Sequence, residues 1–179
     1  MTQPNIEPWL SGSHSAIHPC FRPLLFSLEQ AQQDLRHWTL RLSEEQVWAQ
    51  PLGLAPLGFQ LRHITGSVDR LFTYAEGRQL DDTQMNTLRS EMVPGASLSE
   101  LFGDMDAVFE RVVKKVELLN ADSMFESRGV GKKQLPTTVI GLLVHIAEHT
   151  QRHVGQAILT AKVLNAIGTA SSTSQLSNQ

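Results

Sequence analysis

Apolar residues recur at every third or fourth position in four separate stretches of the chain, and this spacing predicts amphipathic α-helices. The stretches cover residues 24–38, 57–75, 98–119 and 140–158. No stretch shows the strict alternation of apolar and polar residues that indicates a half-buried strand. Helices of this length bury their apolar faces by packing on one another, so we predict an all-α protein built as a four-helix bundle.

Two of these helices carry clear start signals. Ser97 and Glu100 match the S-x-x-E capping box at the start of the third helix, in which each side chain bonds to the other residue's backbone. Thr137 or Thr138 is suited to cap the fourth helix, because a threonine hydroxyl accepts a hydrogen bond from the first free amides. We expect this last helix to end before Gly168.

The remaining segments predict a single domain over residues 1–168 with long connections. The stretch "SEEQVWAQ" is expected to add a helical turn, and residues 121–135, with their glycines, to form a loop or small hairpin. Residues 1–22 are rich in proline and turn residues and form a short N-terminal arm. The small polar residues of 169–179 are expected to form a disordered tail.

Composition and charge exclude several classes of function. The 179 residues suffice for one domain with its own core, and 41% apolar residues with 18% charged residues is typical of a globular protein rather than a disordered one. The formal net charge of −3 gives no basic field to neutralise nucleic-acid phosphates. No apolar run approaches the ~20 residues of a membrane span. We therefore expect neither nucleic acid nor a membrane as partner.

The chain contains one cysteine, Cys20, so no internal disulfide can form. The opening "MTQPNIEPWL" lacks the basic and apolar regions of a secretory signal. Both features predict a cytoplasmic protein. Cys20 stands between Pro19 and Phe21 with no apparent base nearby, so we interpret it as a buried or half-buried residue rather than a nucleophile.

The stretch "HIAEHTQRHVGQ" places His145, His149 and His153 four residues apart. Residues i and i+4 lie one turn apart on nearly the same helix face, close enough for two imidazoles to share a metal ion. His149 and His153 fall at the edge of the apolar arc of the helix, whereas His145 lies toward the polar side, near Arg152. Solvated histidines fit the same spacing, so a third ligand is needed to favour a metal site.

The second helix supplies that candidate within "LRHITGSVDR". His63 lies on the flank of the apolar stripe, and a groove between this helix and the last one would bring it to His149 and His153. Three imidazole ligands leave one coordination position for water or substrate, which is the arrangement of a catalytic zinc site rather than a structural one.

Other metal sites fit the sequence less well. "HIAEH" matches H-x-x-E-H, the inverted zinc-protease signature, with His145 and His149 as ligands and Glu148 as base. Such peptidases need a further carboxylate downstream, and this sequence has no Asp or Glu after Glu148. A di-iron bundle requires Glu-x-x-His on paired helices, and no candidate histidine has a Glu three residues before it. Ligation of haem by one histidine stays open without positive support.

The two histidine segments, "LRHI" and "HIAEHTQRHVGQ", resemble those of the DinB/YfiT-like superfamily of damage-inducible, metal-dependent helical bundles. The likeness extends to the phrases "LSEEQVWAQPLG", "DRLFTYAEGRQL" and "LPTTVIGLLVHIAEHT", and it covers residues 23–165. The resemblance implies a bundle that holds a divalent metal ion.

Carried over residue by residue, the resemblance implies His63, His149 and His153 as the ligands. Gly155 would admit a close neighbouring helix. Gln156 would support a ligand without itself binding the metal. His145 has no fixed place in the ligand set and is interpreted as an exposed or supporting residue. The chain departs from the family at Gln60, where similar sequences often carry another histidine, and this difference is expected to alter the groups that support the ligands.

Family likeness also implies an activity, because the better-understood members resemble thiol transferases and isomerases that use low-molecular-weight thiols, or metal-dependent hydrolases. Our leading hypothesis is a metal-dependent enzyme in which the ion lowers the pKa of a bound thiol or water. Zinc and nickel are the metals we favour, and imidazole ligands also suit iron, manganese or copper. No catalytic residue is assigned.

Arg70 and Tyr74 share the flank of His63 and are candidates to hold an anionic small-molecule substrate or to donate a proton. Residues at such positions also commonly line the edge of a site or pack against neighbouring side chains. Asp69 lies away from that flank, and Glu148 points to the polar face, so no carboxylate presents itself as a general base. This absence favours thiol transfer over water-driven hydrolysis.

Two alternatives remain. One is a non-catalytic bundle that binds metal or a partner in a stress response. In that case Trp9, Leu10 and Phe21 would suit packing against a second subunit in a homodimer as well as against the bundle itself. The other is a bundle that has lost its ancestral metal and keeps the histidines unfilled. An open coordination position facing a cleft would favour the enzyme over both.

Overall fold

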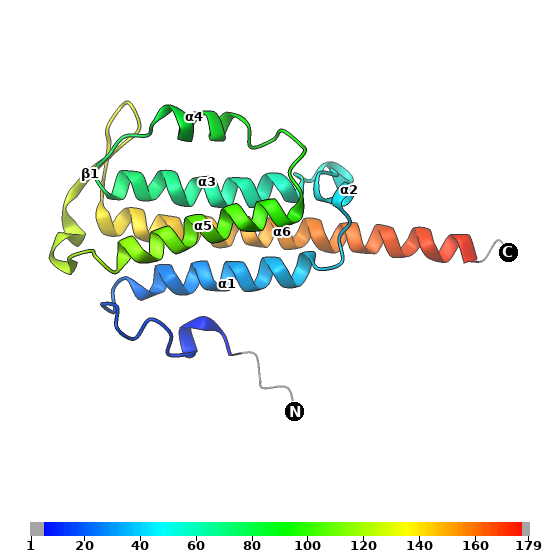
Figure 1. The fold of residues 1–179 in the computed structure, drawn as a ribbon, viewed down its shortest axis with the longest axis horizontal. Helices are drawn as coiled ribbons and strands as arrows, with labels where there is room; N and C mark the ends of the chain where they lie inside the picture. The colour runs from blue at the N-terminus through cyan, green and yellow to red at the C-terminus, as the bar shows by residue number, and fades with distance from the viewer. Residues whose placement is uncertain (1–5, 177–179) are drawn as a thin grey trace.

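Four long helices form the bundle in a computed structural model, which describes residues 6–176 and the side chains of residues 6–168. They are α1 (Arg22–Thr39), α3 (Leu57–Ala75), α5 (Leu98–Val116) and α6 (Val139–Leu176). The helix α6 packs against both α1 and α3, and α5 covers α3 (Figure 1). The predicted all-α fold and the positions of its four main helices are confirmed.

Buried apolar side chains from all four helices meet along the axis of the bundle. In α1, α3 and α5 these side chains occupy the positions whose three- and four-residue spacing predicted the helices. In α6 the buried face differs in part from the predicted stripe, since Ile146 is fully buried whereas Val144, a member of that stripe, is 58% exposed. The core includes Leu28, Leu35, Leu61, Ile64, Met105 and Ile146.

The predicted helix starts are present. Ser97 and Glu100 form the capping box of α5, since the Ser97 hydroxyl accepts from the Glu100 amide and the Glu100 carboxylate accepts from the Ser97 amide. At the start of α6 the Thr138 hydroxyl accepts from the Gly141 amide at 3.1 Å. Of the two threonines considered, Thr138 therefore caps the last helix.

The last helix is longer than expected. It continues past Gly168 to Leu176, because one glycine in a helix costs about 1 kcal/mol relative to alanine and no proline follows to stop it. Residues 169–176, which the sequence placed in a tail, are therefore helical. Residues 177–179 of that tail lie outside the described residues, and the domain boundary at residue 168 stays a prediction.

Shorter elements connect the helices. The stretch after α1 forms a helical turn, α2 (Glu44–Val47), and the segment before α6 forms an antiparallel hairpin, so both predictions hold. The hairpin strands are β1 (Ser127–Val130) and β2 (Leu135–Thr138). The remaining turns are 3₁₀ helices at Pro8–Leu10, Pro51–Gly53 and Ala121–Phe125.

One further helix, α4 (Asp82–Arg89), was not predicted. It begins with a capping box of Asp81 and Gln84, but none of its residues is buried, so it carries no apolar stripe that periodicity can detect. Gln84 Nε2 ties it to α3 by donating to Asp69 Oδ2 at 2.6 Å and to Thr73 Oγ1 at 2.8 Å. The segment that follows α4 carries Glu91, which contacts His63.

Part of the N-terminal arm packs on the bundle. Phe21 is 1% exposed and packs in the core of the bundle, which is one of the two positions that the sequence suited it for. Trp9 and Leu10 remain exposed at 59% and 60%, and the homodimer stays a prediction. Cys20 does have a base nearby, since His18 Nδ1 lies 2.8 Å from its sulfur, but burial raises the pKa of the thiol and disfavours the thiolate.

Within the described part of the chain, none of the helices combines the length and the apolar character needed to cross a membrane.

Candidate metal centre

Three histidines from two helices meet in the groove between α3 and α6. One ring nitrogen from each of His63, His149 and His153 lies within 4.8 Å of the other two. The centroid of the His153 ring is 4.3 Å from that of His63 and 4.5 Å from that of His149. The structure thus brings together the three residues that the sequence singled out, in a group that could hold a metal ion.

The carboxylate of Glu91 fixes the orientation of His63. His63 Nδ1 donates to Glu91 Oε2 at 2.7 Å, which leaves the lone pair on Nε2. The Ser67 hydroxyl lies 3.4 Å from Nε2, and the Phe59 ring stacks against the imidazole with a centroid distance of 5.4 Å. A histidine held this way by a carboxylate is oriented for metal binding and is a stronger electron donor.

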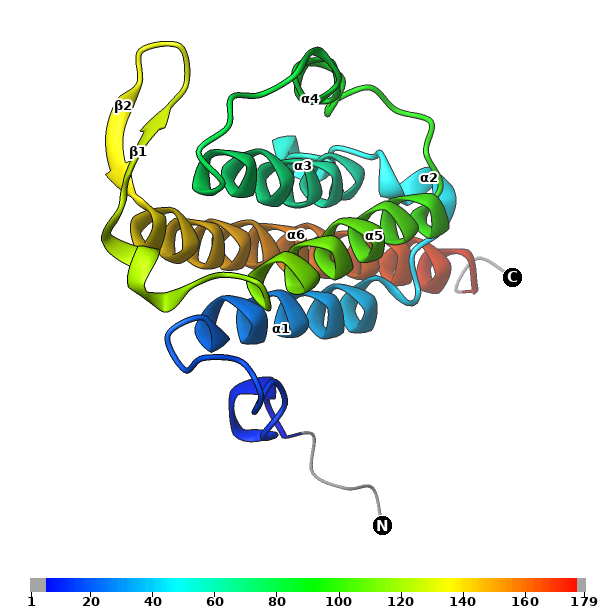
Figure 2. The ribbon, with the colours of Figure 1, turned by 60° about the vertical axis from the view of Figure 1, so that its left-hand side comes forward.

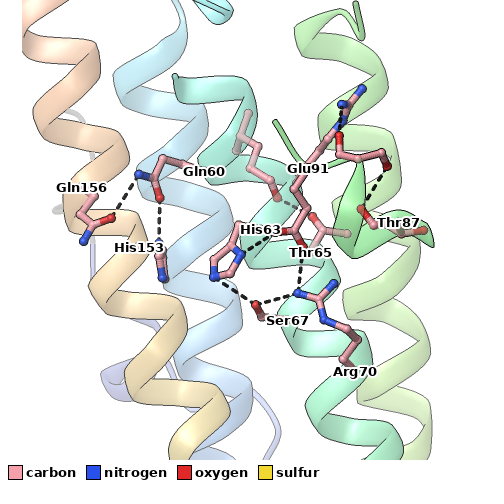
Figure 3. A network of polar contacts seen from close by, with 12 residues as sticks. Gln60, His63, Thr65, Ser67, Arg70, Thr87, Glu91, His153 and Gln156 are labelled. Carbon is pink, nitrogen blue, oxygen red and sulfur yellow. Dashed lines mark hydrogen bonds and ion pairs between the residues drawn. The ribbon is translucent and has the colours of Figure 1, made fainter. Parts of the chain in front are cut away.

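His153 is oriented by an amide in the same manner (Figure 3). Its Nδ1 donates to Gln60 Oε1 at 2.8 Å, and Gln60 Nε2 donates to Gln156 Oε1 at 3.1 Å. The lone pair of His153 is again left on Nε2. The departure from the family pattern at Gln60 therefore supplies an acceptor for His153, and Gln156 supports His153 through Gln60.

His149 has no comparable support. Its Nδ1 is buried and has no hydrogen-bond partner among the described residues. Burial and the neighbouring His153 and His63 lower the pKa of His149 to about 4. Burial, followed by His63 and Arg152, also lowers the pKa of His153. Neutral imidazoles are the form that binds metal, so the donor set fits a divalent transition metal ion.

A buried ion pair stands behind His63. Arg70 Nη2 lies 2.8 Å from Glu91 Oε1, and the two residues are 7% and 4% exposed. Burial alone would raise the pKa of Glu91, but the hydrogen bond from His63 and the charge of Arg70 outweigh it and hold the pKa below its usual value. Glu91 is therefore an ionised carboxylate at neutral pH.

Glu91 is the residue of the candidate site that the sequence analysis missed. Both of its oxygens are engaged, by His63 and by Arg70, so the statement that no carboxylate presents itself as a general base stays a prediction. The residue follows α4 and reaches His63 from 28 positions along the chain. No helical period places it, because it lies outside any regular element. A lone acidic residue among apolar ones in "SEMVPG" is the one available signal.

The loop that carries Glu91 is fixed at both ends. Arg62 Nη1 donates to the carbonyl of Ser90 at 3.1 Å, and Trp48 Nε1 donates to the carbonyl of Ala96 at 2.8 Å. The Arg62 guanidinium also lies over the Trp48 ring, 4.7 Å from its centroid. These contacts hold the backbone on either side of Glu91.

Gly66 makes room for the ion pair on the surface of α3. A Cβ at this position would lie 2.5 Å from Arg70 Nη1 and 3.0 Å from Glu91 Oε1. Because the two side chains are buried and form an ion pair with each other, neither can move away without breaking that pair. We expect Gly66→Ala to lower the free energy of unfolding by about 1–3 kcal/mol.

Gly103→Ala is the matched control, because a Cβ there would meet no atom within 4 Å and the residue is exposed within α5. It is expected to stabilise the protein by up to about 1 kcal/mol. Urea unfolding measures both variants. Equal changes in the two would show that Gly66 has no special role.

The other candidates lie further from the centre. His145 is exposed, and its Nδ1 donates to Glu148 Oε1 at 2.7 Å, which agrees with its interpretation as an exposed residue. Arg70 supports Glu91, whereas Tyr74 is buried in the core, so a substrate contact by either stays a prediction. The role expected of Gly155 is wrong, since a Cβ there would meet no atom within 4 Å and no helix approaches it closely.

The lowered pKa of His149 predicts how the stability of the metal-free protein depends on pH. In the folded state the pKa is about 4, against 6.5 for an unperturbed histidine, so the unfolded chain binds more protons between these values. The contribution of His149 is therefore fully present above pH 6.5 and is lost as the pH falls to about 4. It amounts to at most about 3 kcal/mol.

Urea unfolding of chelator-treated protein at pH 7 and pH 4.5 measures this loss. The variant His149→Gln is the control, and its unfolding free energy should fall less between the two pH values. The same fall in both proteins would contradict the assigned pKa.

Fold and site together define a class of protein: a four-helix bundle in which the second and last long helices bring three histidines together. A family model of the DinB superfamily matches residues 27–157, a span that contains all three histidines. The chain therefore belongs to the DinB superfamily, which confirms the resemblance seen in the sequence. A search of curated proteins gives no match.

Proposed function

We propose that the protein binds one divalent transition metal ion, zinc or nickel, through His63, His149 and His153. The observation that carries this proposal is the support given to the first and last of these residues. Each uses Nδ1 to donate to a fixed acceptor, so each keeps the lone pair on Nε2 for a metal ion. The exposed His145 also donates from Nδ1, but to Glu148 of its own helix, whereas the acceptors of His63 and His153 lie on other segments of the chain.

We further propose that the site is catalytic and that the protein is a metal-dependent enzyme acting on small molecules. Three protein ligands leave a coordination position free, as catalytic zinc sites do. A bound divalent ion would act as a Lewis acid and lower the pKa of a bound thiol or water to about 7.

Of these two nucleophiles, the arrangement of carboxylates favours the thiol. Glu91 has one oxygen engaged by His63 and the other by Arg70, so it is not free to accept a proton from water. A thiol supplies its own nucleophilic atom once deprotonated and needs no separate base. Thiol transfer is therefore the reaction type we propose, with hydrolysis second. The cytoplasmic location remains a prediction.

Titration of cobalt-substituted protein with a small thiol tests this proposal. We expect 2-mercaptoethanol and cysteine to change the visible cobalt spectrum in a saturable manner, whereas ethanol and serine leave it unchanged. The His153→Ala variant should show neither the cobalt spectrum nor the thiol response. Cobalt binding without any thiol response would overturn the thiol reaction and favour a hydrolase or a non-catalytic metal-binding bundle.

A further inference from the structure

A cavity of about 550 Å³ lies between the N-terminal arm and the bundle. The 3₁₀ helix of the arm, Pro8–Leu10, packs beside α1 and closes one side of the cavity (Figure 2). Gln151 of α6 completes the wall on the face that meets α1, whereas the three candidate ligands meet in the groove toward α3 and do not line this cavity. The volume falls within the range of small-molecule binding sites.

The charged residues in the wall of this cavity are both acidic. They are Glu7 of the arm and Asp34, which is half-buried on α1, and neither forms an ion pair among the residues that the structure describes. The lysines and arginines of α1 and α6 are engaged elsewhere by carbonyls, carboxylates or an aromatic ring: Arg22, Arg36, Arg152 and Lys162. The wall therefore carries two negative charges without a countercharge.

The amide groups of the wall present acceptors rather than donors. Gln30 Nε2 donates to Asp34 Oδ1 at 2.9 Å, and Gln151 Nε2 donates to the carbonyl of Ser27 at 2.8 Å. The Ser27 hydroxyl is used in the same way, since it donates to a carbonyl of α6 at 3.1 Å. The amide oxygens of Gln30 and Gln151 are left without a donor in the part of the chain that the structure describes. A ligand that only donates hydrogen bonds fits such a wall.

Two aromatic rings complete the lining. Trp9 is 59% exposed, and Phe26 of α1 is half-buried. Trp9 Nε1 donates to Glu7 Oε2 at 2.5 Å, so the indole is held beside a carboxylate. The face of an aromatic ring attracts a cation, and its apolar surface also packs against an alkyl chain. The rings and the carboxylates thus favour the same kind of ligand.

We propose that this cavity binds a small aliphatic amine in its protonated form. An ammonium group has three N–H donors and no acceptor, so it suits the carboxylate and amide oxygens of the wall. Its positive charge offsets that of Glu7 and Asp34, and its alkyl chain would lie against Trp9 and Phe26. Binding at this cavity does not depend on the proposed metal ion.

Nuclear magnetic resonance of isotope-labelled protein tests the proposal through the indole N–H of Trp9. The chain has three tryptophans, and the Trp9→Phe variant identifies the signal by its disappearance. In chelator-treated protein at constant ionic strength, we expect putrescine and butylamine to shift the Trp9 signal in a saturable manner and to leave the Trp48 signal in place. Butanediol, the uncharged analogue, should have no effect. The protein holds no metal in this experiment, so a failure of the metal proposal would leave the result unchanged.

Asp34→Asn should weaken putrescine binding about tenfold, because it removes a charged acceptor and keeps the shape of the wall. Asp104→Asn is the control: it makes the same change of charge at an exposed residue of α5 that does not line the cavity. Glu7→Gln changes the arm alone and should weaken binding in the same direction. Affinities for putrescine that are equal in all three variants would overturn the proposal. So would the absence of a saturable shift with both amines, or an equal shift with butanediol.

Discussion

Replacing Glu91 by glutamine is expected to lower the free energy of unfolding by about 3–5 kcal/mol, because it leaves the Arg70 guanidinium buried without a compensating charge. Arg70 is 7% exposed, so water cannot take the place of the lost carboxylate. The variant should also bind zinc about 10–100-fold more weakly, since His63 loses the carboxylate that orients it. Chemical unfolding and competition with a zinc chelator measure the two effects.

The double variant Glu91→Leu/Arg70→Met separates charge from packing. It removes both buried charges, so we expect it to recover most of the stability lost in Glu91→Gln. It should not recover zinc affinity, because the acceptor for His63 is still missing. A Glu91→Gln protein as stable as the original would contradict the buried ion pair.

The second large effect is that of His149→Leu on the stability of the protein, which should have opposite signs with and without bound zinc. His149→Leu removes a ligand and is expected to weaken zinc binding by about 3–4 kcal/mol, roughly a quarter of the binding free energy of a four-ligand zinc site. In the metal-free protein the same substitution removes a buried nitrogen that has no partner, so stability should rise by about 1–2 kcal/mol.

Thermal unfolding with zinc and with a chelator tests this reversal directly. With zinc, the original protein should have a higher melting temperature than His149→Leu. With a chelator, His149→Leu should have the higher melting temperature. The variant His145→Leu is the control, because His145 is exposed and bonded to Glu148, and it should leave the zinc-induced shift in melting temperature unchanged. Loss of stability in both conditions would indicate that His149 has a packing role instead.

The helices and the clustering of the three histidines could be predicted from the sequence because both follow from the helical period. The spacing of His149 and His153 places them on one face of α6, and the flank position of His63 places it in the adjoining groove of α3. The capping box at Ser97 predicted the start of α5, because this pattern depends only on residues that are close together in the sequence.

Glu91 and Gln60 could not be assigned in this way. The pairing of Glu91 with His63 depends on how an irregular loop folds back after α4, and no spacing rule describes such a loop. Gln60 was recognised as a departure from the family, but its bond to His153 depends on the distance between α3 and α6. The absence of a neighbour at Gly155 likewise depends on packing between helices rather than on sequence pattern.

The metal content of the purified protein tests the central claim most directly. Elemental analysis of protein made without a histidine tag or added metal should find about one equivalent of a divalent transition metal, and the His149→Ala/His153→Ala variant should contain none. Absence of metal from both proteins, with added zinc or nickel leaving the melting temperature unchanged, would contradict the account and leave three histidines without a metal-binding role.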